Sequence, residues 1–300
     1  MSSKLDGDMP PEQPAPAASL ATYGSLVKLS HTVFALPFAL AAVILASPFA
    51  QITVEKVLLV VICIAAARTA AMAFNRLVDR DIDAKNPRTQ DRELPSGALT
   101  VTQVRVLVLA SCAVFVAAAA RLGAVPLYLS PVALALALGY SYTKRFTALC
   151  HVILGFAVAF APGGAWIAMG APVTLAPWLL VIGVAAWVAG FDVLYSLQDK
   201  GFDEGQSLHS IPVRLGIPGA LLVSALLHVV TVGCLAVAGH VLGRGVAYMV
   251  GVGLIATLLI IEHAIVRPSD LSKLNKAFFD VNGYVSLAFL VSVGIDQALR

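Results

Sequence analysis

The sequence predicts an all-α protein embedded in a membrane, a single polytopic bundle of about nine transmembrane helices. Hydrophobic residues make up 59% of the 300-residue chain and charged residues only 12%, whereas soluble domains carry about 25% charged residues. Apolar stretches of about 20 residues, the length that crosses a bilayer as a helix, recur along the chain. Prolines, glycines and charged residues separate these stretches, so we expect a short loop after each one.

The first segment of the chain differs from the rest. Residues 1–21 are polar, acidic and rich in proline, and they lack the basic start and apolar core of a cleavable signal peptide. We expect a disordered cytoplasmic tail there, followed by one transmembrane domain over residues 22–300. The predicted spans of this domain are, in order, 26–47, 54–78, 101–121, 125–142, 148–169, 175–197, 217–240, 245–266 and 278–298.

The basic residues predict how the bundle sits in the membrane. With the N-terminus in the cytoplasm, thirteen Lys and Arg residues of the loops and span ends lie inside, and four lie outside: Lys56, Arg121, Arg244 and Arg300. Cytoplasmic loops carry such an excess. Because the basic residues follow the topology and form no patch for DNA or RNA, we expect no nucleic-acid partner. Most acidic residues also fall inside, which predicts a site facing the cytoplasm. The membrane is expected to be the inner membrane of a bacterium.

The first acidic cluster, in NRLVDRDID, ends the second predicted span. Asn75, Asp79 and Asp83 follow one another at intervals of four, which places them on one helix face, where neighbouring carboxylates repel unless a cation lies between them. Oxygen ligands of this kind suit Mg²⁺, which one or two carboxylates hold together with water and substrate phosphate. The alternative is a helix that simply ends in water.

The second acidic cluster, in FDVLYSLQDKGFD, ends the sixth predicted span. Asp192, Asp199 and Asp203 follow at intervals of seven and four, and Tyr195 shares their face. Asp192 lies about two turns inside the span, where an unpaired acid is costly, so it is a functional candidate. The spacing of the first cluster recurs here 120 residues further on, and repeats in membrane proteins often place a site at their interface.

Basic residues accompany both acidic clusters. Arginine forks and lysine point charges suit phosphate oxygens, and the alternative for each residue is a role in topology alone. The candidates for binding a diphosphate are Lys28, Arg76, Arg88, Arg92, Lys144 and Arg145. Two histidines, His31 and His151, lie near the cytoplasmic ends of the first and fifth spans. They are candidates to hydrogen-bond an acceptor carboxylate or phenol, with helix capping as the alternative.

Four motifs across the nine spans together resemble one family. In chain order they read NxxxDxxxD, RTxxRxLPSG, YxxTKRxT and DxxYxxxDxxxD, and this series resembles the UbiA superfamily of intramembrane prenyltransferases. The resemblance covers about residues 22 to 298. It implies a helical fold whose central cavity opens to lipid and is capped on the cytoplasmic side. It also implies Mg²⁺ as the cofactor, with ligands among Asn75, Asp79, Asp83, Asp199 and Asp203.

The resemblance further implies individual roles for residues of these motifs. The residues placed in the catalytic centre are Asp79, Asp192, Asp199 and Tyr195. The sequence departs from the family pattern at two positions. The commoner first motif begins Asn-Asp, and Arg76 stands in place of that aspartate, which removes one possible metal ligand. His209 occupies a basic position after the second motif.

The activity implied by the resemblance is the transfer of a polyprenyl group from polyprenyl diphosphate to a small aromatic acceptor in quinone biosynthesis, within membrane lipid. The stretches KLSHTVFALPFAL and YSLQDKGFDEGQSLHSIPVRLG most resemble a 4-hydroxybenzoate polyprenyltransferase-like branch, some of whose members are linked to menaquinone made through futalosine. The acceptor is therefore expected to be a 4-hydroxybenzoate-like phenol of ubiquinone biosynthesis. The alternative acceptor is a naphthoate-type menaquinone precursor.

Two other classes of membrane protein also use acidic residues. In a cation- or proton-coupled transporter, Asp192 would lie on an ion path. A transporter would carry acidic residues through the depth of the membrane or at both ends of its transport path, whereas here they gather on one side. A CDP-alcohol phosphotransferase would carry the signature DGxxAR, which the sequence lacks.

Overall fold

The computed structural model describes residues 19–27, 32–266, 271, 274 and 277–300. Lys28 and His31, two of the predicted site residues, lie outside the described residues, as do residues 1–18 of the predicted tail. Over the described ranges the secondary structure is helical, with no strand. This confirms the predicted all-α class.

The helices follow one another with short connections. In chain order they are α1 (Leu20–Val27), α2 (Thr32–Ala46), α3 (Val54–Asp83), α4 (Val101–Leu122), α5 (Ala124–Thr143), α6 (Cys150–Met169), α7 (Leu175–Ser196), η2 (Leu197–Asp199), α8 (Lys200–Gly205), α9 (Ile211–Val241), α10 (Val246–Ile265), η3 (Ala277–Val281) and α12 (Asn282–Ala298). Eight helical segments are long and apolar enough to cross a membrane, and Phe34–Ala46 is a shorter apolar helix. The protein is an integral membrane protein, and the first predicted span, 26–47, begins in α1 and ends in α2.

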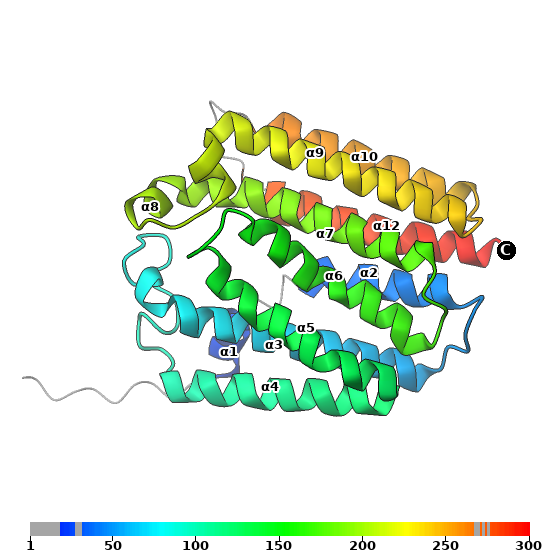
Figure 1. The fold of residues 1–300 in the computed structure, drawn as a ribbon, viewed down its shortest axis with the longest axis horizontal. Helices are drawn as coiled ribbons and strands as arrows, with labels where there is room; N and C mark the ends of the chain where they lie inside the picture. The colour runs from blue at the N-terminus through cyan, green and yellow to red at the C-terminus, as the bar shows by residue number, and fades with distance from the viewer. Residues whose placement is uncertain (1–18, 28–31, 267–270, 272–273, 275–276) are drawn as a thin grey trace, which may run out of the picture.

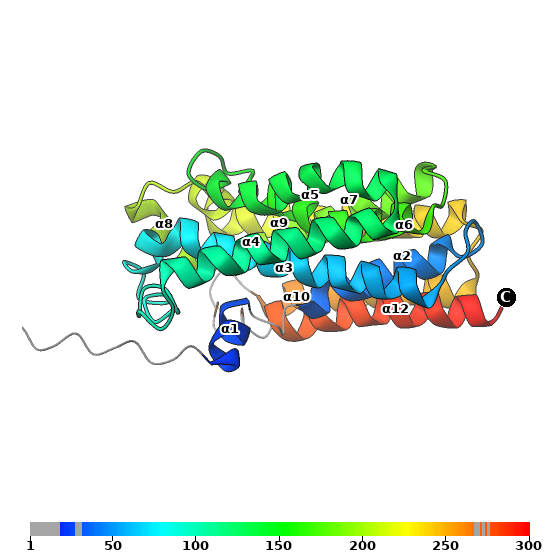
Figure 2. The same cartoon turned by 90° about the horizontal axis from the view of Figure 1, so that it is seen from below.

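The long helices lie roughly side by side along the longest axis of the molecule (Figure 1). Helix α7 packs between α6 and α9, while α2 packs against α6 and α12. The loop after α3, the short helix α8 and the start of α9 gather at one end of the bundle, and the C-terminus lies at the other (Figures 1 and 2). We call the first of these the charged end, because the last turn of α3, the loop at 84–100 and the second acidic cluster meet there.

Two helices extend beyond their predicted spans and carry the acidic clusters. Helix α3 begins at a Thr53 cap, whose Oγ1 accepts a hydrogen bond from the Lys56 backbone N–H at 3.2 Å. It runs on to Asp83 instead of ending at residue 78, so the first acidic cluster is helical throughout. Helix α7 continues through η2 and α8. The second acidic cluster therefore follows a bend and not one straight helix.

Helix α9 begins earlier than its predicted span, at Ile211 instead of residue 217. Its regular geometry is interrupted at Gly216, where φ is 68° and ψ is 179°. This left-handed conformation favours glycine. The first turn of α9 is thereby separated from the membrane-length part, and it lies over the end of α6 at the charged end.

Aromatic side chains hold the centre of the bundle together. Phe38 lies 4.9 Å from the ring centroid of Trp187 and 4.9 Å from that of Phe289, which joins α2, α7 and α12. Close helix packing also depends on small residues. A Cβ atom at Gly155 would lie 2.2 Å from the carbonyl oxygen of Ala185, so α6 and α7 approach closely at this glycine.

A second buried network links four helices away from the acidic clusters. Asn282 donates to Glu262 Oε1 at 2.7 Å, and Trp187 Nε1 donates to Asn282 Oδ1 at 2.8 Å. His228 Nδ1 and His263 Nε2 are 3.0 Å apart. Buried polar groups need such partners. The network connects α7, α9, α10 and α12.

Candidate functional site

Asp79, at the centre of the first acidic cluster, is held by two basic residues of the connection between α5 and α6. Lys144 Nζ lies 2.9 Å from one carboxylate oxygen of Asp79, and Arg145 Nη2 lies 3.1 Å from the other. Asn75 donates a hydrogen bond to the same carboxylate at 3.1 Å. Since Asp79 is only 3% exposed, these three donors replace the water that a carboxylate needs.

Asp83, one turn further along α3, is held by the loop that follows. Arg92 Nη1 lies 2.8 Å from both carboxylate oxygens of Asp83. Thr89 Oγ1 donates to the Asp83 carbonyl oxygen at 3.1 Å, which turns the loop back over the helix end. The RTxxRxLPSG motif is thereby folded onto the first acidic cluster.

Asp199, in the second acidic cluster, is held by the same loop. Arg88 Nε donates to Asp199 Oδ1 at 2.9 Å, and Arg88 Nη2 donates to Oδ2. Asn86 Nδ2 donates to Oδ1 at 3.2 Å. The Arg88 guanidinium lies over the Tyr195 ring, 5.6 Å from its centroid. Burial alone lowers the pKa of Arg88, but its hydrogen bond to Asp199 and the charge of Asp199 outweigh burial and raise that pKa.

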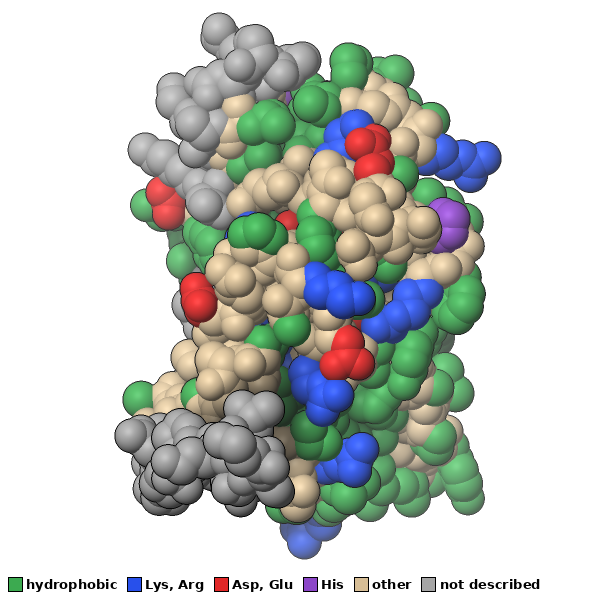
Figure 3. Space-filling view, turned by 90° about the vertical axis from the view of Figure 1, so that its left-hand side faces the viewer, with side chains coloured by type: hydrophobic (Ala, Val, Ile, Leu, Met, Phe, Trp, Pro, Cys, Tyr) green, Lys and Arg blue, Asp and Glu red, His purple; other side chains and the backbone are tan. Residues whose placement is uncertain are grey.

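The two acidic clusters therefore meet through their cations. Arg88, which binds Asp199, also lies within electrostatic range of Asp83. Lys144, which binds Asp79, acts on Asp203 in α8. Figure 3 looks onto this end of the molecule and shows Lys and Arg side chains interleaved with acidic ones. The structure thus brings together residues from four stretches that the sequence analysis had selected separately.

Two arginines of α3, Arg68 and Arg76, form no ion pair with any residue that the structure describes. Arg76 is 3% exposed, and the buried Nε–H group of each arginine has no hydrogen-bond acceptor among the described residues. Both charges act on Tyr140 of α5, as do those of Asp79 and Asp192. A buried guanidinium that makes no direct ion pair is costly. These two side chains are therefore suited to bind an anionic ligand.

Sequence reasoning missed Arg68 and Asn86. Arg68 lies inside the predicted span 54–78, and an ionisable residue at that depth was itself a signal of function. It also precedes Asn75 by seven residues, which places the two on the same face of α3. Asn86 offered a weaker signal, because it belongs to a loop whose fold decides where its amide points.

Asp192 is paired with His151. His151 Nδ1 lies 2.7 Å from Asp192 Oδ2, and His151 Nε2 accepts a hydrogen bond from the Ile211 backbone N–H at 3.3 Å. The histidine thus caps the first turn of α9 in addition to binding the acid. Both of its ring nitrogens are engaged.

The acidic residues of the charged end offer only oxygen ligands. Among the described residues, no group of three or more Asp, Glu, His or Cys side chains lies close enough to hold a metal ion. Asp79, Asp83 and Asp199 each face a cation instead. Mg²⁺ is held by one or two carboxylates with substrate phosphates. This donor set therefore fits Mg²⁺ together with a phosphate ligand, with Asp79 and Asp83 on one side and Asp199 and Asp203 on the other.

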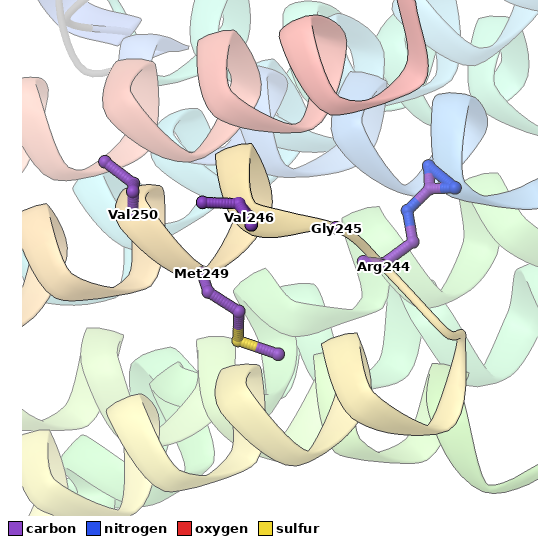
Figure 4. A pocket seen from close by; sticks show the side chains of 5 residues that line it. All are labelled: Arg244, Gly245, Val246, Met249 and Val250. Carbon is purple, nitrogen blue, oxygen red and sulfur yellow. The ribbon is translucent and has the colours of Figure 1, made fainter. Parts of the chain in front are cut away.

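A surface pocket at the opposite end of the bundle has a different character (Figure 4). It is lined by Arg244, Gly245, Val246, Met249 and Val250. Arg244 Nε lies 3.3 Å from Asp296, and Arg244 Nη2 donates to Gln297 at 2.8 Å. Because its charged residue is already paired and the remaining lining is apolar, this pocket offers no catalytic groups.

Comparison with known proteins identifies relatives over most of the chain. The UbiA prenyltransferase family profile matches residues 35–292. A 4-hydroxybenzoate octaprenyltransferase from Aromatoleum aromaticum is 29% identical over 229 residues, which is 76% of this chain and 77% of that protein.

Solved structures share the fold. The apo structure of a UbiA homolog from Aeropyrum pernix K1 is 33% identical, with a TM-score of 0.77 over 90% of this chain and 97% of that chain. A UbiA homolog from Archaeoglobus fulgidus, bound to GPP and Mg²⁺, is 20% identical, with a TM-score of 0.72 over 92% of this chain and 99% of that chain.

Proposed function

Because the chain belongs to the UbiA prenyltransferase family, we propose that it transfers a polyprenyl group from a polyprenyl diphosphate to a carboxylated aromatic acceptor in quinone biosynthesis. The observation that carries this proposal is the meeting of two acidic clusters with four cations at the charged end. The four cations are Arg88, Arg92, Lys144 and Arg145. The alternative function, a cation- or proton-coupled transporter, is not needed to explain why these charged residues gather at one end.

The paired charges are suited to exchange partners when a diphosphate arrives. The guanidinium and ammonium groups would turn from the carboxylates to the phosphate oxygens, which they bind well. Asp79, Asp83, Asp199 and Asp203 would then be free to hold Mg²⁺ against the diphosphate. When bound, Mg²⁺ stabilises the negative charge of the departing diphosphate as a Lewis acid.

The basic residues add to this stabilisation of the leaving group. Charge builds on the diphosphate as the carbon–oxygen bond to the allylic group breaks, and fixed cations aimed at that charge lower the barrier. Burial of the site excludes water from the resulting allylic cation. The prenyl tail can remain among the apolar helices and lipid while its diphosphate occupies the charged end, which we place on the cytoplasmic side.

Arg68 and Arg76 support an acceptor that carries a carboxylate. Both charges act on Tyr140, and neither arginine forms an ion pair in the described part of the chain. Both residues precede Asp79 on α3. A bidentate contact between a guanidinium and a carboxylate would orient the ring. The names of the relatives favour a 4-hydroxybenzoate-like acceptor, and a naphthoate-type precursor of menaquinone is the second candidate, since both carry the carboxylate.

Product analysis tests this proposal. The purified protein in lipid nanodiscs is incubated with Mg²⁺, a labelled polyprenyl diphosphate and one acceptor at a time: 4-hydroxybenzoate, a dihydroxynaphthoate, and the matching phenol and naphthol that lack the carboxylate. We expect a ring-prenylated product by mass spectrometry with one of the two carboxylated acceptors. Preference for either decarboxylated ring would contradict the role of the arginines, and the absence of any prenylated product would contradict the activity.

A further inference from the structure

The pair formed by His151 and Asp192 stands apart from the ion pairs that neutralise the other acids. His151 is the second residue of α6, and its side chain is 4% exposed. Its Nδ1 atom lies 2.7 Å from Asp192 Oδ2 on α7. No Lys or Arg is paired with Asp192 among the described residues, so a histidine takes the place that cations hold at Asp79, Asp83 and Asp199.

The contact with α9 fixes which ring nitrogen of His151 carries the proton. Ile211 is the first residue of α9, and the first backbone N–H groups of a helix have no partner within it. This N–H donates to His151 Nε2 at 3.3 Å, so Nε2 must present its lone pair. The proton therefore sits on Nδ1 and is donated to Asp192. Such contacts set the orientation of a histidine.

Only one carboxylate oxygen of Asp192 is used in this way. Asp192 Oδ2 accepts from His151, while Oδ1 makes no hydrogen bond to any described residue. The Asp192 side chain is 25% exposed, unlike that of its partner. Its charge acts on Tyr140, together with the charges of Arg68 and Arg76. Asp192, Arg68 and Arg76 therefore all lie within electrostatic range of Tyr140.

We propose that His151 is a positioning residue that holds Asp192 so that its free oxygen Oδ1 accepts the hydroxyl proton of the aromatic acceptor. This inference rests on the proposed function and names the acid–base group of the same site. A carboxylate at Arg68 and Arg76 and a hydroxyl at Asp192 would bind the two ends of a hydroxylated aromatic acid. The histidine itself does not touch the acceptor, because both of its nitrogens are occupied.

The proton transfer accompanies the alkylation. The ring carbon beside the hydroxyl-bearing carbon bonds to the first carbon of the prenyl group, whose bond to the diphosphate oxygen breaks with the electron pair leaving on the diphosphate. The hydroxyl proton passes to Asp192 Oδ1, which leaves a cyclohexadienone. The alkylated carbon then loses its hydrogen as a proton to the departed diphosphate, the C–H electron pair returns to the ring, and Asp192 gives its proton back to the oxygen. The products are the prenylated phenol and a diphosphate that carries one added proton.

Two substitutions of His151 separate this role from simple capping of α9. In His151→Asn the amide nitrogen takes the place of Nδ1, so the donor to Asp192 is kept and the acceptor for the Ile211 N–H is lost. In His151→Gln the longer amide reaches the place of Nε2, so the cap is kept and the donor to Asp192 is lost. Thermal unfolding of both variants in nanodiscs reports any effect on the fold.

We expect His151→Gln to lower kcat for prenyl transfer by about 100-fold, and His151→Asn to stay within about tenfold of the unsubstituted protein. The KM for polyprenyl diphosphate should be unchanged in both. The slow release of diphosphate without acceptor should also be unchanged, because Asp192 acts on the acceptor. The reverse order of the two variants, equal effects of both, or a loss of diphosphate release would overturn the proposal. Absence of transfer by the unsubstituted protein would instead contradict the proposed function.

Discussion

Arg88 donates hydrogen bonds to both carboxylate oxygens of Asp199, and this contact joins the loop after α3 to the second acidic cluster. The two residues are 111 positions apart in the chain. Together with the contacts of Lys144 and Arg145 to Asp79, it draws three separate stretches into one site. The charges of this site are balanced internally, which prepares it for a ligand that brings its own negative charge.

Removing the charge of Asp79 tests whether the first acidic cluster is catalytic. Asp79→Asn keeps the shape of the side chain but leaves Lys144 and Arg145 without their anion and removes a proposed metal ligand. We expect kcat for prenyl transfer to fall by at least about 100-fold. Asp81→Asn is the matched control, since Asp81 lies on the same helix with its side chain 80% exposed. Similar activity of both variants would contradict a catalytic role and would show that the first acidic cluster only ends a helix in water.

Removing divalent cations tests the oxygen ligand set. Because the acids offer no thiolate or imidazole set for a transition metal, we expect transfer to stop in excess EDTA and to return when Mg²⁺ alone is added. Residual transfer is measured by product mass spectrometry after dialysis. Full activity without divalent cations would rule out a metal role for both acidic clusters.

Arg68→Gln tests the binding of the acceptor carboxylate. The substitution removes a buried charge that has no ion-pair partner among the described residues. We therefore expect the KM for the carboxylated acceptor to rise by about tenfold or more, with the KM for polyprenyl diphosphate unchanged. Arg105→Gln is the control, because Arg105 is exposed on α4. A rise in the diphosphate KM instead would move Arg68 to the diphosphate site.

Cysteine labelling tests the orientation in the membrane. On a background where Cys63, Cys112, Cys150 and Cys234 are replaced, a single cysteine is introduced at Gln206 or at Gln51. Both positions are exposed, Gln206 at the charged end and Gln51 in the connection between α2 and α3 at the opposite end. We expect Gln206→Cys to react only in permeabilised cells and Gln51→Cys to react in intact cells. The opposite pattern would place the charged end outside.

The fold and the identity of the acidic residues were accessible from the sequence, because both depend on local pattern. Apolar runs of membrane length define helices without reference to their neighbours, and spacing by four places Asn75, Asp79 and Asp83 on one face. The end of α3 at Asp83 was harder to predict, since a helix can leave the apolar region when a loop such as 84–100 folds back on it.

The sequence did not predict which basic residue pairs with which acidic residue. Which cation faces which acid depends on how loops cross the end of the bundle, and the sequence gives no distance between residue 88 and residue 199. The sequence also could not decide between two roles for His151, helix capping and hydrogen bonding to the acceptor. Its contacts with Asp192 and Ile211 are visible only in the structure. Arg68 differs, since its position inside an apolar span was a signal of function that the sequence analysis overlooked.

The exchange of partners at the charged end is tested most directly by determining the structure with Mg²⁺ and a polyprenyl thiolodiphosphate, whose sulfur link resists ionisation. We predict that Arg88, Arg92, Lys144 and Arg145 contact the diphosphate oxygens and that Asp79 and Asp199 face Mg²⁺. A ligand bound elsewhere, with Arg88 still paired to Asp199 and Lys144 to Asp79, would contradict the account.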